Sequence, residues 1–197
     1  MPGRQHDPRL VVRDLVQAVV PYDERESADQ QWVLDWIDAG HPLFRTAKPA
    51  TPHRHLAVYA ALLDEAARTL MLVDHAKAKA WLLPGGHVDP QENPQVTVVR
   101  ELDEELKIAP PFHLRLGSAP FFLTVTETRP PHSHTDVTLW FVFSASQQQE
   151  IVPDLAEFSV CRWFALNDTA AWVGEFDPQM FRFMAKLTSA LELAPVG

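Results

Sequence analysis

Cysteine is nearly absent from the sequence, which contains only Cys161. A single thiol cannot form an internal disulfide, and it leaves no partners for a zinc site built from cysteines. We expect this side chain to pack within a strand. The scarcity of cysteine fits a reducing compartment, so the predicted location is cytoplasmic.

Positive charge is also scarce, because 17 lysines and arginines face 26 aspartates and glutamates, for a formal net charge of -9. This balance argues against nonspecific nucleic-acid binding and against docking on anionic lipid. A phosphate-bearing ligand would therefore need bound cations. One short basic stretch could help to collect a polyanion, or could simply be a solvated linker. Its residues are Arg45, Lys48, His53, Arg54 and His55.

Long apolar runs are missing as well. No segment approaches the roughly 20 consecutive apolar residues that a membrane-spanning helix needs. The first ten residues, MPGRQHDPRL, contain no apolar run after their basic residue, which is unlike a secretory signal. The sequence therefore predicts no membrane association.

What is present is typical of a globular domain, with 46% hydrophobic and 22% charged residues. Apolar spacing predicts helices over residues 9–20 and 27–40, the second capped by Ser27. A proline-rich linker follows. We predict a helical N-terminal extension with its linker over residues 1–48 and the main domain over residues 49–197.

The main domain alternates strands with few helices. Two apolar runs separated by the turn DEAAR predict an antiparallel hairpin over residues 55–76. Asn93 and Pro94 form a cap and first turn for a helix that continues to Leu106, and a last helix begins at Asp177 and Pro178. The fold class is α/β, a mixed sheet with helices on its faces. The other predicted strands cover residues 80–86, 119–127, 136–146 and 158–166.

The first helix of this domain collects acidic side chains. At about 100° per residue, Glu101, Glu104 and Glu105 share one arc of the surface. We expect Val96, Val99, Leu102 and Leu106 to form the opposite, buried face. Like charges at this spacing repel, so a divalent cation is expected among them. A plain solvated helix face is the alternative interpretation.

The spacing decides between these interpretations. A glycine, five residues, Glu92, seven residues and then RELDEE with the aliphatic Ile108 form the pattern of the Nudix box, so the chain resembles the Nudix hydrolases. One position departs from that pattern, because Lys107 stands where the family usually has glycine. The departure affects the end of the helix rather than the acidic residues.

The resemblance implies an α/β/α sandwich around a mixed sheet and hydrolysis of a diphosphate linkage in a nucleoside diphosphate derivative. It implies Mg²⁺ or Mn²⁺ as the cofactor, held by Glu101, Glu105, Glu104 and the Gly86 carbonyl. Arg100 would orient the glutamates, and Glu92 would complete the loop. The substrate would be a small molecule, with Arg45, Arg54 and His134 as further candidate contacts.

The general base is not fixed by the resemblance. It could be Glu105, or an acid from the loop over residues 147–158, which offers Glu150, Asp154 and Glu157. We prefer Glu157.

A second group of polar residues precedes a central strand. His132, His134 and Asp136 alternate, so they could face one side of a strand and contact a metal or a phosphate. Hydrogen-bonded structural histidines are the alternative.

Two other functions stay open. The chain could be a catalytically silent Nudix module that binds a nucleotide or a protein as a regulator, although the complete set of acids favours an enzyme. Isomerisation of an isoprenoid diphosphate is disfavoured, because it relies on a cysteine and Cys161 lies far along the chain from the acidic helix. The leaving group is undetermined, and the N-terminal helices with Trp32 and Trp36 could cap the domain or form a homodimer contact.

Overall fold

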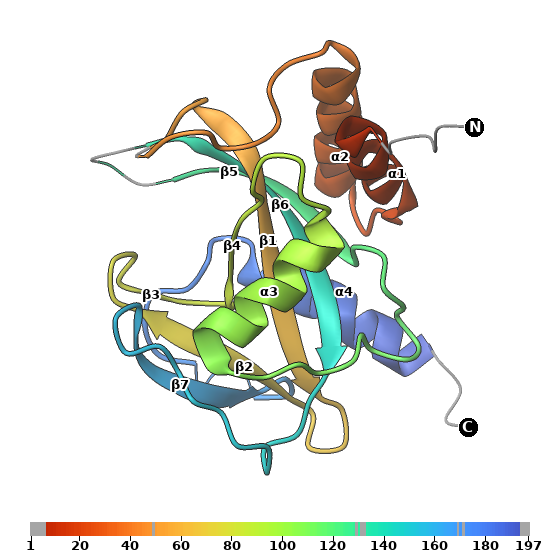
Figure 1. Ribbon diagram of the computed structural model, residues 1–197. Helices are drawn as coiled ribbons and strands as arrows, with labels where there is room; N and C mark the ends of the chain where they lie inside the picture. Colours follow the sequence, from red (N-terminus) through yellow and green to blue (C-terminus); the bar gives the residue numbers. More distant parts are fainter. Residues whose placement is uncertain are drawn as a thin grey trace, which may run out of the picture. The chain divides into compact units, whose positions relative to one another are not determined.

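A computed structural model describes residues 7–48, 50–128, 130, 133–168, 170 and 172–193. In this part of the chain, seven strands form a mixed sheet in the hydrogen-bonded order β3-β2-β1-β6-β5, with β4 on β1 and β7 on β2 (Figure 1). Four helices accompany the strands, which confirms the predicted fold class. The elements are α1 (Pro8–Ala18), α2 (Glu24–Asp38), β1 (Arg54–Asp64), β2 (Thr69–His75), β3 (Ala80–Leu82), β4 (Gly85–His87), α3 (Pro94–Leu106), β5 (Phe122–Glu127), β6 (Thr135–Ser144), β7 (Phe158–Ala165) and α4 (Met180–Leu193).

The chain divides into two compact units. The first comprises Met1–Tyr59, Gly86–Val99 and Ala119–Phe141, and the second comprises Ala60–Gly85, Arg100–Ser118 and Val142–Gly197. Each unit therefore combines segments that are far apart in the sequence. The predicted boundary between residues 48 and 49 divides the helical extension from the main domain instead of these two units, and it stays a prediction.

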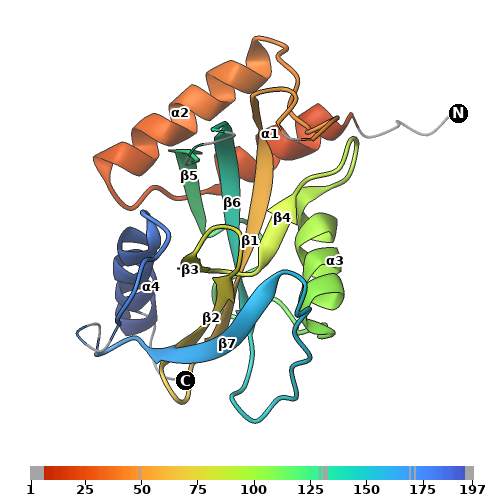
Figure 2. The same cartoon turned by 90° about the vertical axis from the view of Figure 1, so that its left-hand side faces the viewer.

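In the first unit, α1 and α2 form a helical pair (Figure 2). The helix α2 begins at Glu24, so the prediction that Ser27 caps it was wrong. Asp23 is the cap, because its side chain accepts a hydrogen bond of 2.8 Å from the amide of Glu26. An aspartate one turn earlier satisfies the first amides, and the helix extends to meet it.

A buried carboxylate fixes α2 to β5. The side chain of Glu26 is fully buried, and it accepts hydrogen bonds from the amides of Tyr22 at 2.7 Å and of Leu123, in β5, at 3.1 Å. Trp36 on the same helix is 5% exposed, and Trp32 stacks on it with ring centroids 6.2 Å apart. In this unit the helical extension therefore covers β5, whereas a homodimer contact stays a prediction.

Replacement of Glu26 by alanine should lower the free energy of unfolding by about 2 kcal/mol, because two amides lose a charged acceptor in a buried position. Chemical denaturation of the full chain measures the change. Glu24→Ala is the matched control, since Glu24 lies in the same helical turn but is exposed. Equal stability of the two variants would contradict the role of Glu26.

The second unit contains the predicted hairpin. β1 and β2 pair antiparallel, with Leu62 opposite Met71 and Asp64 opposite Thr69, around the predicted turn. β7 pairs antiparallel with β2 on its other side. The predicted strand over residues 80–86 is instead two short strands, β3 and β4, which pair with β2 and β1 respectively. Pro84 separates them, since proline lacks the amide that a continuous strand needs.

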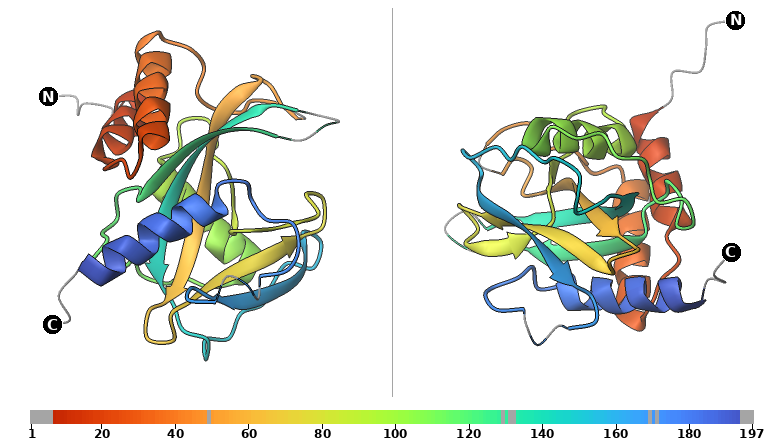
Figure 3. Two further views of the ribbon diagram at one scale, coloured as in Figure 1. Left: turned by 180° about the vertical axis from the view of Figure 1, so that it is seen from behind. Right: turned by 90° about the horizontal axis from the view of Figure 1, so that it is seen from below.

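Figure 3 shows the ribbon of β7 and of α4 in the same unit. Aromatic side chains from β7, from the loop after it and from α4 contact one another. Phe164 lies 4.8 Å from Trp172 and 5.8 Å from Phe176, measured between ring centroids. The helix α4 begins at Met180, three residues after Asp177, whose carboxylate accepts a hydrogen bond of 2.7 Å from the amide of Gln179. The predicted start at Asp177 therefore marks the turn before the helix.

None of the helices in the described ranges combines the length and the apolar character that crossing a membrane requires.

Candidate active site

The acidic helix α3 begins as predicted. The side chain of Asn93 accepts a hydrogen bond of 2.9 Å from the amide of Gln95, and Pro94 occupies the first turn. Glu92 lies just before this cap, and its carboxylate accepts a hydrogen bond of 2.7 Å from the hydroxyl of Thr97. The loop of the Nudix box is thus tied to the first turn of its own helix.

The buried face of α3 differs from the prediction. Val96 and Val99 are 56% and 36% exposed, so their assignment to the buried face was wrong. Helical spacing allowed more than one apolar stripe, and the stripe that is buried also contains a glutamate. Glu105 therefore lies on the same arc as buried apolar residues instead of on the opposite side. The buried positions are Pro94, Thr97, Val98, Leu102, Glu105 and Leu106.

The end of α3 accommodates the unusual Lys107. This residue has a φ of 56°, in the left-handed region that favours glycine. The amide of Ile108 reaches back to the carbonyl of Leu102 at 3.4 Å, and the amide of Lys107 bonds the carbonyl of Asp103 at 3.2 Å. A turn of the kind that ends helices at glycine is therefore formed here by a lysine.

Replacement of Lys107 by glycine should stabilise the protein by about 0.5–1 kcal/mol, because glycine adopts this backbone conformation without the steric cost of a side chain. The midpoint of thermal unfolding of Lys107→Gly and of wild type measures the effect. Lys79→Gly, at another lysine with a positive φ of 53°, provides a comparison. A lower midpoint for Lys107→Gly would contradict this account.

Arg100 organises the acidic residues of the second unit. One of its guanidinium nitrogens, Nη1, lies 3.0 Å from Oε1 of Glu101 and 3.0 Å from Oε2 of Glu104. The Glu101 side chain is 13% exposed and that of Glu104 is 56% exposed. Arg100 therefore holds one shielded and one solvated carboxylate in fixed positions.

Glu105 is the most buried of the three acids, at 6% exposure. Its Oε2 accepts a hydrogen bond of 2.9 Å from the amide of Gly85, a residue whose φ of 147° favours glycine. Burial, together with the charge of Glu101, raises the pKa of Glu105 to about 9. Burial also raises the pKa of Glu101. Charge is thus costly in this cluster unless a cation is present.

The loop after β6 packs on the end of α3. The amide of Asp154 bonds the carbonyl of Glu105 at 2.7 Å, and the amide of Val152 bonds the carbonyl of Leu106 at 3.1 Å. The charge of Glu157 contributes to the raised pKa values of Glu101 and Glu105. Within the second unit, the structure brings together Arg100, Glu101, Glu104, Glu105 and Glu157.

Cys161 also lies in electrostatic range of this cluster. Burial and the charge of Glu105 raise the pKa of the thiol to about 11, which keeps it protonated near neutral pH. Cys161 is therefore close to Glu105 within the second unit, although the two residues lie far apart in the sequence.

The remaining candidates lie in the first unit. Gly86 belongs to β4, directly after the glycine that bonds Glu105. The guanidinium of Arg54 lies 4.5 Å from the centre of the Trp32 ring, while Arg45 is half-buried in the linker. His134 approaches Asp136 and two histidines that were not predicted as its neighbours. His132 lies outside the described residues.

Comparison with known proteins agrees with this fold. The family model of the NUDIX domain matches residues 53–187. No curated protein sequence matches the chain. The solved structures that resemble it include a MutT NUDIX hydrolase from Burkholderia pseudomallei, with 22% identity, a TM-score of 0.52, and coverage of 68% of this chain and 98% of that chain.

Two further structures share the fold. The NUDIX domain of Shewanella oneidensis NrtR, solved with ADP ribose, is 20% identical, with a TM-score of 0.54 and coverage of 82% of this chain and 97% of that chain. The Escherichia coli dihydroneopterin triphosphate pyrophosphohydrolase is 13% identical, with a TM-score of 0.52 and coverage of 78% and 100%.

The mixed sheet with its flanking helices is the Nudix fold, whose members are generally metal-dependent pyrophosphohydrolases of nucleoside diphosphate derivatives. The chain belongs to the Nudix family, since the family model matches more than half of its length. The predicted resemblance is thereby confirmed.

Proposed function

We propose that the chain is a Mg²⁺- or Mn²⁺-dependent hydrolase that cleaves the diphosphate linkage of a nucleoside diphosphate derivative by attack of water on phosphorus. The observation that supports this most directly is the linked set of Glu101, Glu104 and Glu105 around Arg100. A purely structural helix has no need for a buried carboxylate beside two others.

The donor set suits a hard divalent cation. Carboxylate oxygens are the ligands that Mg²⁺ and Mn²⁺ prefer, and one arginine does not balance the three acids of the cluster. Glu101 and Glu105 would hold the ion, with Glu104 and the carbonyl of Gly86 as further ligands. Bound there, the ion would withdraw electron density from phosphorus and lower the pKa of a bound water.

The protein's own residues orient and shield the reaction. Arg100 fixes Glu101 and Glu104, and the amide of Gly85 fixes Glu105. The short loop that precedes α3 is held by Glu92, which bonds Thr97. These contacts place the carboxylates before substrate arrives, so that little reorganisation accompanies the reaction. Arg45 and Arg54 are proposed as more peripheral contacts to substrate, whereas His134 lies among the histidines around Asp136.

Glu157 is the proposed general base. Its carboxylate is close enough to Glu101 and Glu105 to raise their pKa values, and it stays partly exposed, at 41% of the side chain. By comparison, Asp154 already accepts a hydrogen bond of 2.8 Å from the amide of Ala156, and Glu150 is exposed.

Replacement of Glu157 by glutamine should reduce kcat by about 10²-fold and remove the acidic limb of the pH profile, because proton abstraction contributes on this scale. Glu150→Gln is the control from the same loop. A reduced kcat with an unchanged pH profile would show that Glu157 is not the base.

A screen for hydrolysis tests the proposed activity. The full-length protein is incubated with Mg²⁺ or Mn²⁺ and a panel that includes ADP ribose, ADP-sugars, oxidised nucleotides, dinucleoside polyphosphates and non-nucleotide diphosphates. Product analysis identifies which phosphorus bond breaks. Metal-dependent turnover of at least one compound supports the proposal, while isomer formation from a C5 isoprenoid diphosphate would support the alternative that uses Cys161.

The regulatory alternative predicts a different result. A catalytically silent module would bind a nucleotide from the same panel with no dependence on Mg²⁺ and without turnover. Calorimetric titration in the presence and absence of Mg²⁺ distinguishes this outcome from hydrolysis.

A further inference from the structure

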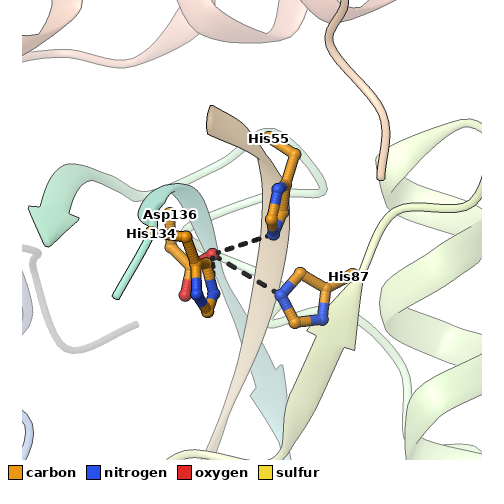
Figure 4. Close-up of side chains that lie close together, drawn as sticks. All are labelled: His55, His87, His134 and Asp136. Atoms are coloured by element: carbon orange, nitrogen blue, oxygen red, sulfur yellow. Dashed lines mark ion pairs between the residues drawn. The ribbon is translucent and has the colours of Figure 1, made fainter. Parts of the chain in front are cut away.

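Three histidines and an aspartate converge at one point of the first unit (Figure 4). His55 comes from β1, His87 from β4, His134 from the residue before β6, and Asp136 from β6 itself. One ligand atom from each side chain lies within 4.8 Å of all the others. These four residues, the histidine cluster, share no member with the acidic residues of the Nudix box.

The three imidazoles approach the same carboxylate oxygen. Oδ1 of Asp136 lies 3.4 Å from Nε2 of His55, 3.5 Å from Nε2 of His87 and 3.2 Å from Nε2 of His134. The Nε2 atoms of His55 and His87 and the Oδ1 atom of Asp136 are buried and make no hydrogen bond. Buried polar atoms without a hydrogen bond are costly, so this arrangement points to a missing ligand.

The tautomer of His55 explains why its Nε2 makes no hydrogen bond to Asp136. Its Nδ1 lies 2.7 Å from the carbonyl oxygen of Pro52, and a carbonyl can only accept. Nδ1 therefore carries the proton, and in the neutral ring Nε2 presents a lone pair to the oxygen of Asp136. Two lone pairs that face each other repel unless a cation lies between them.

Outer contacts orient the ligands in the manner of known metal sites. A metal-binding histidine usually directs its second nitrogen to a carbonyl, a carboxylate or a hydroxyl. His55 does so through Pro52, and Nδ1 of His134 lies 3.0 Å from the hydroxyl of Thr128. Both contacts direct Nε2 toward the centre of the cluster.

The distances from the aspartate oxygen suit a particular coordination geometry. A tetrahedral zinc ion with ligands at about 2.0–2.1 Å places its ligand atoms about 3.3–3.4 Å apart. The three distances from the aspartate oxygen, 3.2–3.5 Å, lie around that value. Imidazole nitrogens favour zinc over magnesium, so the chemistry of the donors agrees with the geometry.

We propose that His55, His87, His134 and Asp136 form a tetrahedral Zn²⁺ site that is separate from the magnesium or manganese site of the Nudix box. Four protein ligands leave no open position for water, which makes the site structural rather than catalytic. The ion would join the beginnings of β1 and β6 to the end of β4. Since His87 directly follows Gly86, it would also fix the backbone at the start of the Nudix box.

Elemental analysis of the full-length protein tests the proposal. The protein is expressed with zinc in the medium and purified without immobilised-metal chromatography. We expect about one zinc per chain after extensive dialysis. His87→Ala and Asp136→Asn should weaken zinc binding by more than the ~10- to 100-fold that changes to outer contacts cause.

Two controls separate this site from the rest of the molecule. His53→Ala removes an exposed imidazole two residues before His55, and Glu101→Gln removes a carboxylate of the Nudix box. Both variants should retain zinc at the level of the wild type. Because zinc content is measured without reference to turnover, failure of the proposed hydrolase activity would leave this result unaffected.

Cobalt provides a readout for which no variant is needed. Wild-type protein stripped of zinc and loaded with Co²⁺ should show the intense visible absorption of tetrahedral coordination. X-ray absorption at the zinc edge should show nitrogen or oxygen ligands, with imidazole among them, and no sulfur. Wild type that neither contains nor takes up zinc, zinc content unchanged in His87→Ala, or stoichiometric iron or manganese in place of zinc would each overturn the proposal.

Discussion

Replacement of Glu105 by glutamine should lower metal-dependent turnover by about 10²- to 10⁴-fold, the range over which a positioned carboxylate contributes to catalysis. Glutamine preserves the size of the side chain and can still accept the hydrogen bond from Gly85. It cannot supply a negative charge to a divalent ion. The expected loss therefore comes from weakened metal binding rather than from altered packing.

The kinetic comparison uses the substrate that the screen identifies. Turnover of Glu105→Gln is measured over a range of Mg²⁺ concentrations beside wild type and Asp103→Asn, an exposed acid on the same helix. Asp103→Asn should behave like wild type. If Glu105→Gln retained full activity at every Mg²⁺ concentration, Glu105 would not be a ligand and the proposed site would be wrong.

The second large effect concerns stability without added divalent ions. The pKa of Glu105 is raised from 4.5 to about 9 in the folded protein. Between these values the unfolded carboxyl group is ionised while the folded one holds its proton, so folding takes up a proton. The free energy of unfolding must then fall as the pH rises, by at most about 1.4 kcal/mol per pH unit from this group.

We expect wild type to lose on the order of 2–3 kcal/mol between about pH 5.5 and about pH 8, relative to Glu105→Gln. Denaturation curves of the two proteins at several pH values give the difference, with Glu104→Gln as an exposed control. Added Mg²⁺ should offset the loss in wild type but not in Glu105→Gln, since the ion binds the ionised carboxylate. Parallel pH profiles for the two proteins would contradict the buried environment of Glu105.

Local sequence signals specified several elements of the fold because they depend on neighbouring residues alone. Asn93 and Pro94 defined the start of α3, and the turn DEAAR defined the hairpin of β1 and β2. The same kind of signal was ambiguous at α2, where Asp23 and Ser27 could each cap a helix. Either residue supplies a side-chain acceptor, so only the packing of the helix could choose between them.

The sequence by itself determined the family and the acidic group, because the spacing of the Nudix box places its glutamates on successive turns of one helix. Tertiary structure decided which carboxylate is buried, since several arcs of α3 were apolar enough to face the interior. It also brought His55, His87 and His134 around Asp136, from three segments of the chain. Helical periodicity is local, whereas contacts between distant strands depend on the register of the whole sheet.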